Sequence, residues 1–277
     1  AALGEEQRAI EYYEQALAVA REIGDRRNEK VLLGNLGLAY ADLGDILQAI
    51  EYHEGALNIS REIGDRAAEG NHLNNLGNAY FVLGEPRRAI EYQEQALAIA
   101  RENEDRAAEG AHLGNLGIAY RDLGDAQRAI EYHEQGLEIA RELGDRRGEG
   151  AHLSNLGLDY ATLGEPWRAV EYYEAALVIA REIGDRRGKG NLLGNLGIAY
   201  TALGKVRRAI KYYEAALAID REFGDREAEA NHLNNLGIAF ASQGEMERAV
   251  RHYEGALAIA RHLGDRQGEG NHSWNLG

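Results

Sequence analysis

The sequence repeats itself at a fixed interval of 40 residues. The stretch GNLGLAY at residues 34–40 returns in related form at 74–80, 114–120, 154–160, 194–200 and 234–240, and its first part returns at 274–277. A period of roughly 20 to 50 residues is the signature of stacked-repeat architectures. Each unit of such an array contacts only its neighbours. We therefore expect residues 1–277 to form a single all-α solenoid.

One repeat, taken as residues 25–64, reads as two helices. Glycine at 24 and 44 is followed each time by aspartate at 25 and 45. Glycine commonly ends a helix and aspartate commonly caps the start of the next one. We predict helix A at about 26–43 and helix B at about 46–63. Apolar residues recur at helical spacing in both, so neither helix can bury its apolar stripe alone.

The repeat pattern divides the chain into a half repeat, six full repeats and a partial repeat. Residues 1–24 supply a lone helix B, residues 25–64, 65–104, 105–144, 145–184, 185–224 and 225–264 are full repeats, and residues 265–277 begin another helix A. One junction departs from the pattern, because Asn103-Glu104-Asp105 stands where other repeats have an apolar residue, Gly and Asp. We expect a looser or more continuous helical turn there.

Composition and motifs exclude several classes of function. The formal net charge of −15 disfavours nucleic acid, which needs a basic footprint, and favours neutral or basic partners. No apolar run is long enough to cross a bilayer, no secretion leader begins the sequence, and there is no cysteine, so we expect a cytoplasmic protein. No catalytic constellation or phosphate loop stands apart from the repeat, and no two histidines lie four residues apart. We expect no catalysis, no cofactor and no metal.

The repeat resembles the tetratricopeptide repeat (TPR). Leu36-Gly37, Tyr40, Gly44, Ala49 and Ala56-Leu57 fall at the intervals of that family. The departures are Leu33 in place of the usual tryptophan, no closing proline, and a repeat of 40 rather than about 34 residues. The elongated form is similar to the repeats of Pins/LGN-type adaptors and of bacterial signalling TPR proteins. The resemblance implies a right-handed superhelix of antiparallel helix pairs, whose A helices line a concave channel that binds an extended or helical peptide.

The exposed face of helix A carries a recurring asparagine, which has mediocre helix propensity. An amide offers two donors and an acceptor, enough to grip a peptide backbone. Aliphatic residues accompany it one turn later, which suits a partner offering backbone and a few apolar anchors. Arg121 is the strong cation of this face. Related arrays that hold chaperone tails use a clamp of several cationic residues, and one arginine is too few for it. The predicted peptide-binding residues are Asn35, Asn71, Asn74, Asn75, Asn78, Phe81, Asn115, Ile118, Arg121, Asn155, Leu158, Asn195, Ile198, Asn231, Asn234, Asn235 and Ile238.

Two alternatives stay open. Each asparagine could instead cap or bridge backbone between repeats and never meet a ligand. The protein could also be a structural or autoregulatory arm that associates head to tail through its terminal half repeats, or that packs on an attached effector domain. The leading hypothesis is a non-catalytic scaffold for protein–protein interaction.

Overall fold

A computed structural model describes residues 2–276 of the chain, with side chains from residue 7 onwards. These residues form 14 α-helices and no strand. The helices are α1 (Ala2–Ile23), α2 (Arg26–Asp42), α3 (Ile46–Ile63), α4 (Arg66–Val82), α5 (Pro86–Glu102), α6 (Arg106–Asp122), α7 (Ala126–Leu143), α8 (Arg146–Thr162), α9 (Pro166–Glu182), α10 (Arg186–Ala202), α11 (Val206–Phe223), α12 (Arg226–Ser242), α13 (Met246–Leu263) and α14 (Arg266–Trp274). Even-numbered helices are the predicted A helices and odd-numbered helices the B helices.

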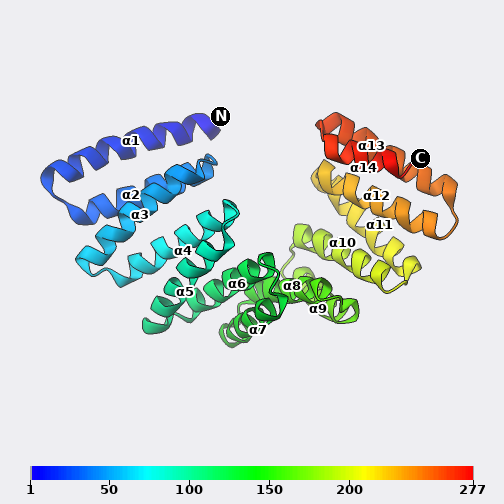
Figure 1. The fold of residues 1–277 in the computed structure, drawn as a ribbon, viewed down its shortest axis with the longest axis horizontal. Helices are drawn as coiled ribbons and strands as arrows, with labels where there is room; N and C mark the ends of the chain where they lie inside the picture. Colours follow the sequence, from blue (N-terminus) through cyan, green and yellow to red (C-terminus); the bar gives the residue numbers. More distant parts are fainter. Residues whose placement is uncertain (1, 277) are drawn as a thin grey trace. The chain divides into compact units, whose positions relative to one another are not determined.

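The chain divides into two compact units, Ala1–Leu143 with α1 to α7 and Gly144–Gly277 with α8 to α14. Within each unit every helix packs against the next one along the chain, so that consecutive helices run antiparallel (Figure 1). Helix α4 also contacts α6, and α8 contacts α10, which joins A helices of successive repeats. The all-α solenoid class is thus confirmed. A single uninterrupted solenoid over both units stays a prediction.

The turns between helices follow the predicted glycine–aspartate rule. Asp65 precedes α4, and its side chain accepts a hydrogen bond from the main-chain nitrogen of Ala68 at 3.1 Å. Gly64 before it ends α3 in the left-handed region, at φ 72°. Such a cap satisfies main-chain groups that the helix leaves without a partner. The two prolines, Pro86 and Pro166, begin α5 and α9, where the missing amide hydrogen costs nothing.

The junction at residues 103–105 differs from the prediction. Helix α5 ends at Glu102, and Asp105 caps α6 as in the other repeats, so the turn is neither looser nor continuous. Glu104 takes the position of the missing glycine at φ 56°, the one non-glycine residue with positive φ among the described residues. Capping by Asp105 and packing on both sides hold the turn, and Glu104 carries the strain.

The core lies between helices of neighbouring repeats. Leu36, Leu73 and Leu76 are fully buried, and the stripe of helix B from Ala49 to Ser60 is buried as predicted. Gly37 allows α2 and α3 to approach closely, because a Cβ atom there would lie 2.7 Å from the His53 ring. Burying a leucine contributes about 1.5–3 kcal/mol, so stacking supplies what a lone helix pair lacks.

Candidate functional site

The predicted peptide-binding residues all lie on A helices, and none of them is buried. Asn71, Asn78, Leu158, Ile198, Asn231 and Ile238 are exposed, and the other predicted residues are half-buried. We call this surface the A-helix face, comprising those residues on α2, α4 and α6 of the first unit and on α8, α10 and α12 of the second. Each unit therefore presents a surface of amides and aliphatic side chains.

In the first unit, a groove of about 440 Å³ runs between α2 and α4. Asn35 and Leu38 line it from α2, and Asn71, Asn74 and Asn75 line it from α4. Lys30 is among the lining residues that were not predicted. Glycine or alanine stands at the equivalent of Lys30 in the other repeats, and that departure is the signal that sequence reasoning passed over.

A network of amides joins α4, α5 and α6. Gln93 Nε2 donates to Asn78 Oδ1 at 3.0 Å and to Asn74 Oδ1 at 3.2 Å. Asn115 Nδ2 donates to the same two oxygens, at 3.1 Å to Asn74 and 3.3 Å to Asn78. The ring of His112 lies 3.1 Å from Gln93 Oε1 and completes the network. Gln93 is its centre and was missed, although His or Tyr occupies the equivalent position in every other full repeat.

A smaller cavity of about 80 Å³ adjoins this network, lined by Phe81, Ile118 and Ala89 among others. Its walls are mainly carbon, with the amides of Asn78, Gln93 and Asn115 at the rim. A cavity of this size and lining suits one small aliphatic side chain.

The second unit contains a related arrangement. Asn234 Oδ1 accepts a hydrogen bond from Asn275 Nδ2 at 2.9 Å and lies 3.1 Å from His272 Nδ1. Asn74 with Asn115, and Asn234 with Asn275, are both pairs 41 residues apart. On the A helices of this unit, Ile198 of α10 and Ile238 of α12 have 53% and 43% of their surface exposed, so both are open to a partner.

The recurring asparagines thus fall into two groups. Asn115 and Asn275 bridge helices through side-chain bonds, rather than through the backbone contacts of the structural alternative. Four others are half-buried, and their side chains make no hydrogen bond within the described residues: Asn35, Asn75, Asn195 and Asn235. Asn155 also has an interaction partner. For Asn115 and Asn275 the acceptor is the asparagine at position 74 or 234 of the preceding repeat. An amide without a protein partner keeps its full capacity for a ligand.

Histidines that recur at one repeat position pack between helices. His53 and His72 are buried, with ring centroids 5.8 Å apart. Burial lowers the pKa of each to about 4, with the positive charge of His72 adding to the effect on His53 and that of Lys30 to the effect on His72. Both are neutral at pH 7. Within residues 2–276 no group of three or more His, Asp or Glu side chains is arranged to hold a metal ion.

Buried glutamates in the first turn of the A helices were also missed. Glu69 accepts from Arg61 Nε at 2.8 Å and from Arg66 Nη1 at 2.6 Å. Burial alone would raise the pKa of Glu69, but the two arginines lower it overall. Glu29, Glu109 and Glu229 have the same pair of arginine partners in their repeats. These charge clusters join successive repeats and lie apart from the A-helix face residues.

No described helix is both long and apolar enough to cross a membrane. The sequence matches a family model described as tetratricopeptide repeat over residues 29–102, 107–182, 150–222 and 188–262, and a second model of the same description over residues 1–27. The chain has no match among curated protein sequences.

Solved structures share the fold at low sequence identity. BtubC (BKLC) from P. vanneervenii is 21% identical, with a TM-score of 0.64 and coverage of 94% of this chain and 92% of that one. A signal transduction ATPase with a tetratricopeptide repeat sensor from Pyrococcus horikoshii is 17% identical, with a TM-score of 0.73 and coverage of 98% and 46%. A Rap protein complexed with competence and sporulation factor is 16% identical, with a TM-score of 0.65 and coverage of 97% and 84%.

Proposed function

Because this chain belongs to the tetratricopeptide repeat family, we propose that it is a non-catalytic scaffold that binds an extended or helical peptide segment of a partner protein on its A-helix face. Proteins of this family generally mediate protein–protein interactions, and no catalytic family matches the chain. A protein of the same fold has been solved in complex with competence and sporulation factor, which supports ligand binding by this architecture.

The observation that carries the proposal is the group of half-buried asparagines without hydrogen-bond partners. Asn75 lies in the groove between α2 and α4 beside the exposed Leu38, and Asn235 lies on α12 near the exposed Ile238. Amides of this kind can hold the backbone of a peptide while aliphatic neighbours contact its apolar side chains. In the first unit, the cavity beside Phe81 and Ile118 offers a place for one such side chain.

The test begins with peptides selected on the wild-type chain from a random library displayed on phage. The affinity of a selected peptide is then measured for the double variant Asn75→Ala, Asn235→Ala. Each lost hydrogen bond removes about 1 kcal/mol of binding free energy, so affinity falls about fivefold per asparagine that the peptide meets. Neither asparagine bonds to a neighbour, so circular dichroism and thermal stability stay unchanged.

A second variant reports on the stability that the amide network provides. Asn74→Ala removes an amide oxygen that Gln93 and Asn115 both use, so this variant loses stability through the network. Unchanged peptide affinity in the Asn75, Asn235 double variant would count against the A-helix face as the binding surface.

Self-association is the second candidate function. The observation that favours it is apolar exposure on the first and last helices: Ile23 of α1 and Trp274 of α14 are 69% and 85% exposed. Association of these surfaces between copies would cover both. Sedimentation of the full chain over a range of concentrations tests it, and a monomer at high concentration contradicts it. Removal of residues 1–24 reduces the association if α1 takes part.

A further inference from the structure

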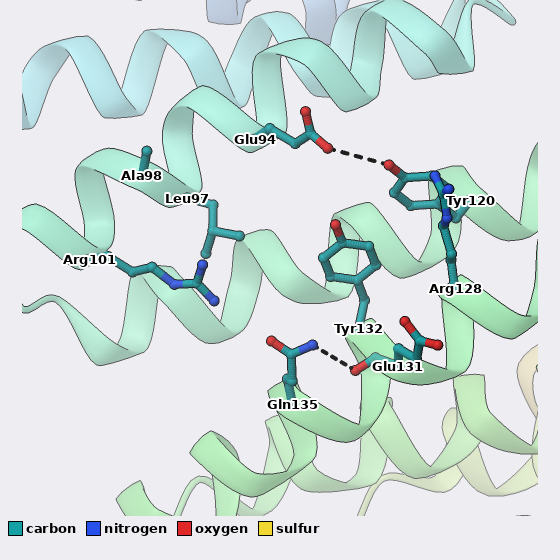
Figure 2. A pocket seen from close by; sticks show the side chains of 9 residues that line it. All are labelled: Glu94, Leu97, Ala98, Arg101, Tyr120, Arg128, Glu131, Tyr132 and Gln135. Carbon is teal, nitrogen blue, oxygen red and sulfur yellow. Dashed lines mark hydrogen bonds between the residues drawn. The ribbon is translucent and has the colours of Figure 1, made fainter.

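A second groove, formed mainly by B helices, is separate from the A-helix face. It has a volume of about 560 Å³ and lies between α5 and α7, with the end of α6 beside it. Figure 2 shows Leu97 and Arg101 on one side and Tyr132 on the other, with Glu94 above. None of the predicted peptide-binding residues lines it.

Stacked tyrosines form one wall of this groove. The rings of Tyr120 and Tyr132 lie parallel, with centroids 5.2 Å apart. The Tyr120 hydroxyl donates to Glu94 Oε1 at 3.3 Å, so this carboxylate is held at the edge of the groove (Figure 2). The face of an aromatic ring attracts a cation positioned over it. Tyr132 is half-buried, so part of its ring surface remains accessible from the groove.

The groove is lined by two arginines and two glutamates, which differ in their partners. Its two arginines already have acidic partners: Arg101 pairs with Glu109 at 2.7 Å, and Arg128 pairs with Asp125 at 3.3 Å. The two glutamates, Glu94 and Glu131, form no ion pair with any described residue. Among the charged lining residues, the two carboxylates are therefore the ones whose charge is uncompensated by an ion pair, and they stand beside an aromatic surface.

The position of Glu131 carries glutamate in four full repeats and a basic residue in two, so the fold itself does not require an acidic residue there. One repeat earlier, Arg61 Nη2 donates to Gln95 Oε1 at 3.1 Å and spans the equivalent space. No such bond joins Arg101 to Gln135 among the described residues. In the second unit, Lys211 and Arg251 replace the glutamate at the position of Glu131. The fold thus accepts either charge at this position.

We propose that the groove between α5 and α7 binds a lysine or arginine side chain of a basic protein partner, with the cation between the carboxylates of Glu94 and Glu131 and against the ring of Tyr132. A cation with these neighbours gains two ion pairs and a contact with an aromatic face. The uncompensated charge of the groove selects a cation over an anion, since both lining arginines are already paired.

The test uses a fluorescein-labelled peptide of alternating arginine and glycine and an uncharged peptide with citrulline at each arginine position. Fluorescence anisotropy measures binding to the full chain at low and at physiological salt. We expect the arginine peptide to bind and the citrulline peptide not to bind. Glu131→Lys, which copies the natural Lys211, weakens binding of the arginine peptide about tenfold, because one ion pair is lost and one repulsion gained.

Glu91→Lys is the matched control. Glu91 occupies the position of Glu131 one repeat earlier, where the bond between Arg61 and Gln95 spans the equivalent space. The substitution changes the net charge by the same amount as Glu131→Lys. We expect Glu91→Lys to retain the affinity of the wild type within about twofold, as expected for a change in distant surface charge. Equal losses in both variants would show attraction to an acidic surface in general and overturn the proposal, as would binding of the citrulline peptide.

Discussion

At the scale of single residues, one glycine per repeat sets the distance between helices A and B. A Cβ atom at Gly37 would lie 2.7 Å from the His53 ring, and at Gly157 it would lie 2.5 Å from the Tyr173 ring. The partner always lies 16 residues further on, as His, Gln or Tyr, so a large flat side chain rests on bare backbone in each full repeat. Such close packing leaves no room for even a methyl group.

We predict that Gly37→Ala lowers the free energy of unfolding by about 1–2 kcal/mol. The clash with His53 costs more than alanine gains in helix propensity. Gly55→Ala is the control, because its Cβ would lie 3.4 Å from Leu33, an ordinary contact. That variant gains up to about 1 kcal/mol from helix propensity. Urea unfolding of both variants checks the pair, and equal effects of the two changes would contradict the explanation.

The strained residue Glu104 leads to an opposite prediction. Glycine adopts positive φ without the steric cost that glutamate bears. Glu104→Gly therefore raises the free energy of unfolding by about 1 kcal/mol. Gly64→Glu, at φ 72° in another turn, lowers it by a similar amount. A denaturant midpoint that falls in Glu104→Gly would refute this account of the turn.

At the scale of helices, charge clusters built on Glu29, Glu69, Glu109 and Glu229 connect the end of a B helix to the start of the following A helix. Arg61 at the end of α3 and Arg66 at the start of α4 share Glu69, and Arg66 also pairs with Glu102 of α5 at 2.5 Å. A buried carboxylate with two guanidinium partners contributes more to stability than an exposed ion pair does. Together with the pair between Arg66 and Glu102, this cluster holds three helices in register. Lys189 stands where the other repeats have this glutamate.

We predict that Lys189→Glu stabilises the second unit by about 1 kcal/mol, since the new carboxylate would lie between Arg181 and Arg186. Glu69→Lys makes the reverse change in the first unit and removes the partner of Arg61 and Arg66. It lowers the free energy of unfolding by about 1–3 kcal/mol. Thermal unfolding compares the two variants, and a loss of stability in Lys189→Glu would contradict the role given to the cluster.

At the scale of the whole molecule, the two units differ in their buried titratable groups. The first unit has His53 and His133 packed on the glycine of helix A, and the second has Tyr173, Tyr213 and Tyr253 at the same position. Burial holds the pKa of His53 and His72 at about 4, below the ordinary value of about 6.5. In this pH range the unfolded chain binds protons that the folded chain does not, so the units differ in their response to acid.

Stability should therefore fall as the pH is lowered from about 6.5 to 4, by up to about 3 kcal/mol for each of these two histidines. This contribution to stability is fully present above pH 6.5, where the two histidines are neutral in both the folded and the unfolded chain. Hydrogen exchange at pH 7 and at pH 5, corrected for intrinsic rates, should show the larger loss of protection in residues 1–143. The variant His53→Gln, which copies Gln93, reduces the loss. Equal loss of protection in the two units, unaffected by this variant, would contradict the assignment.

The features of the fold that could be predicted from the sequence alone are those that depend on interactions between residues close in the chain. Glycine, aspartate and proline at fixed places set the helix ends, and apolar spacing set the buried stripes, because these effects act within a few residues. The position of the A-helix face followed from the same spacing.

Only the tertiary structure decided which of its asparagines are engaged. Asn115 depends on an acceptor 41 residues earlier, and Glu69 is buried by arginines of two helices. Beside Tyr132, no bond between Arg101 and Gln135 among the described residues matches the one between Arg61 and Gln95. These contacts join residues that are distant in the chain, and they depend on side-chain differences between repeats that the period itself does not reveal.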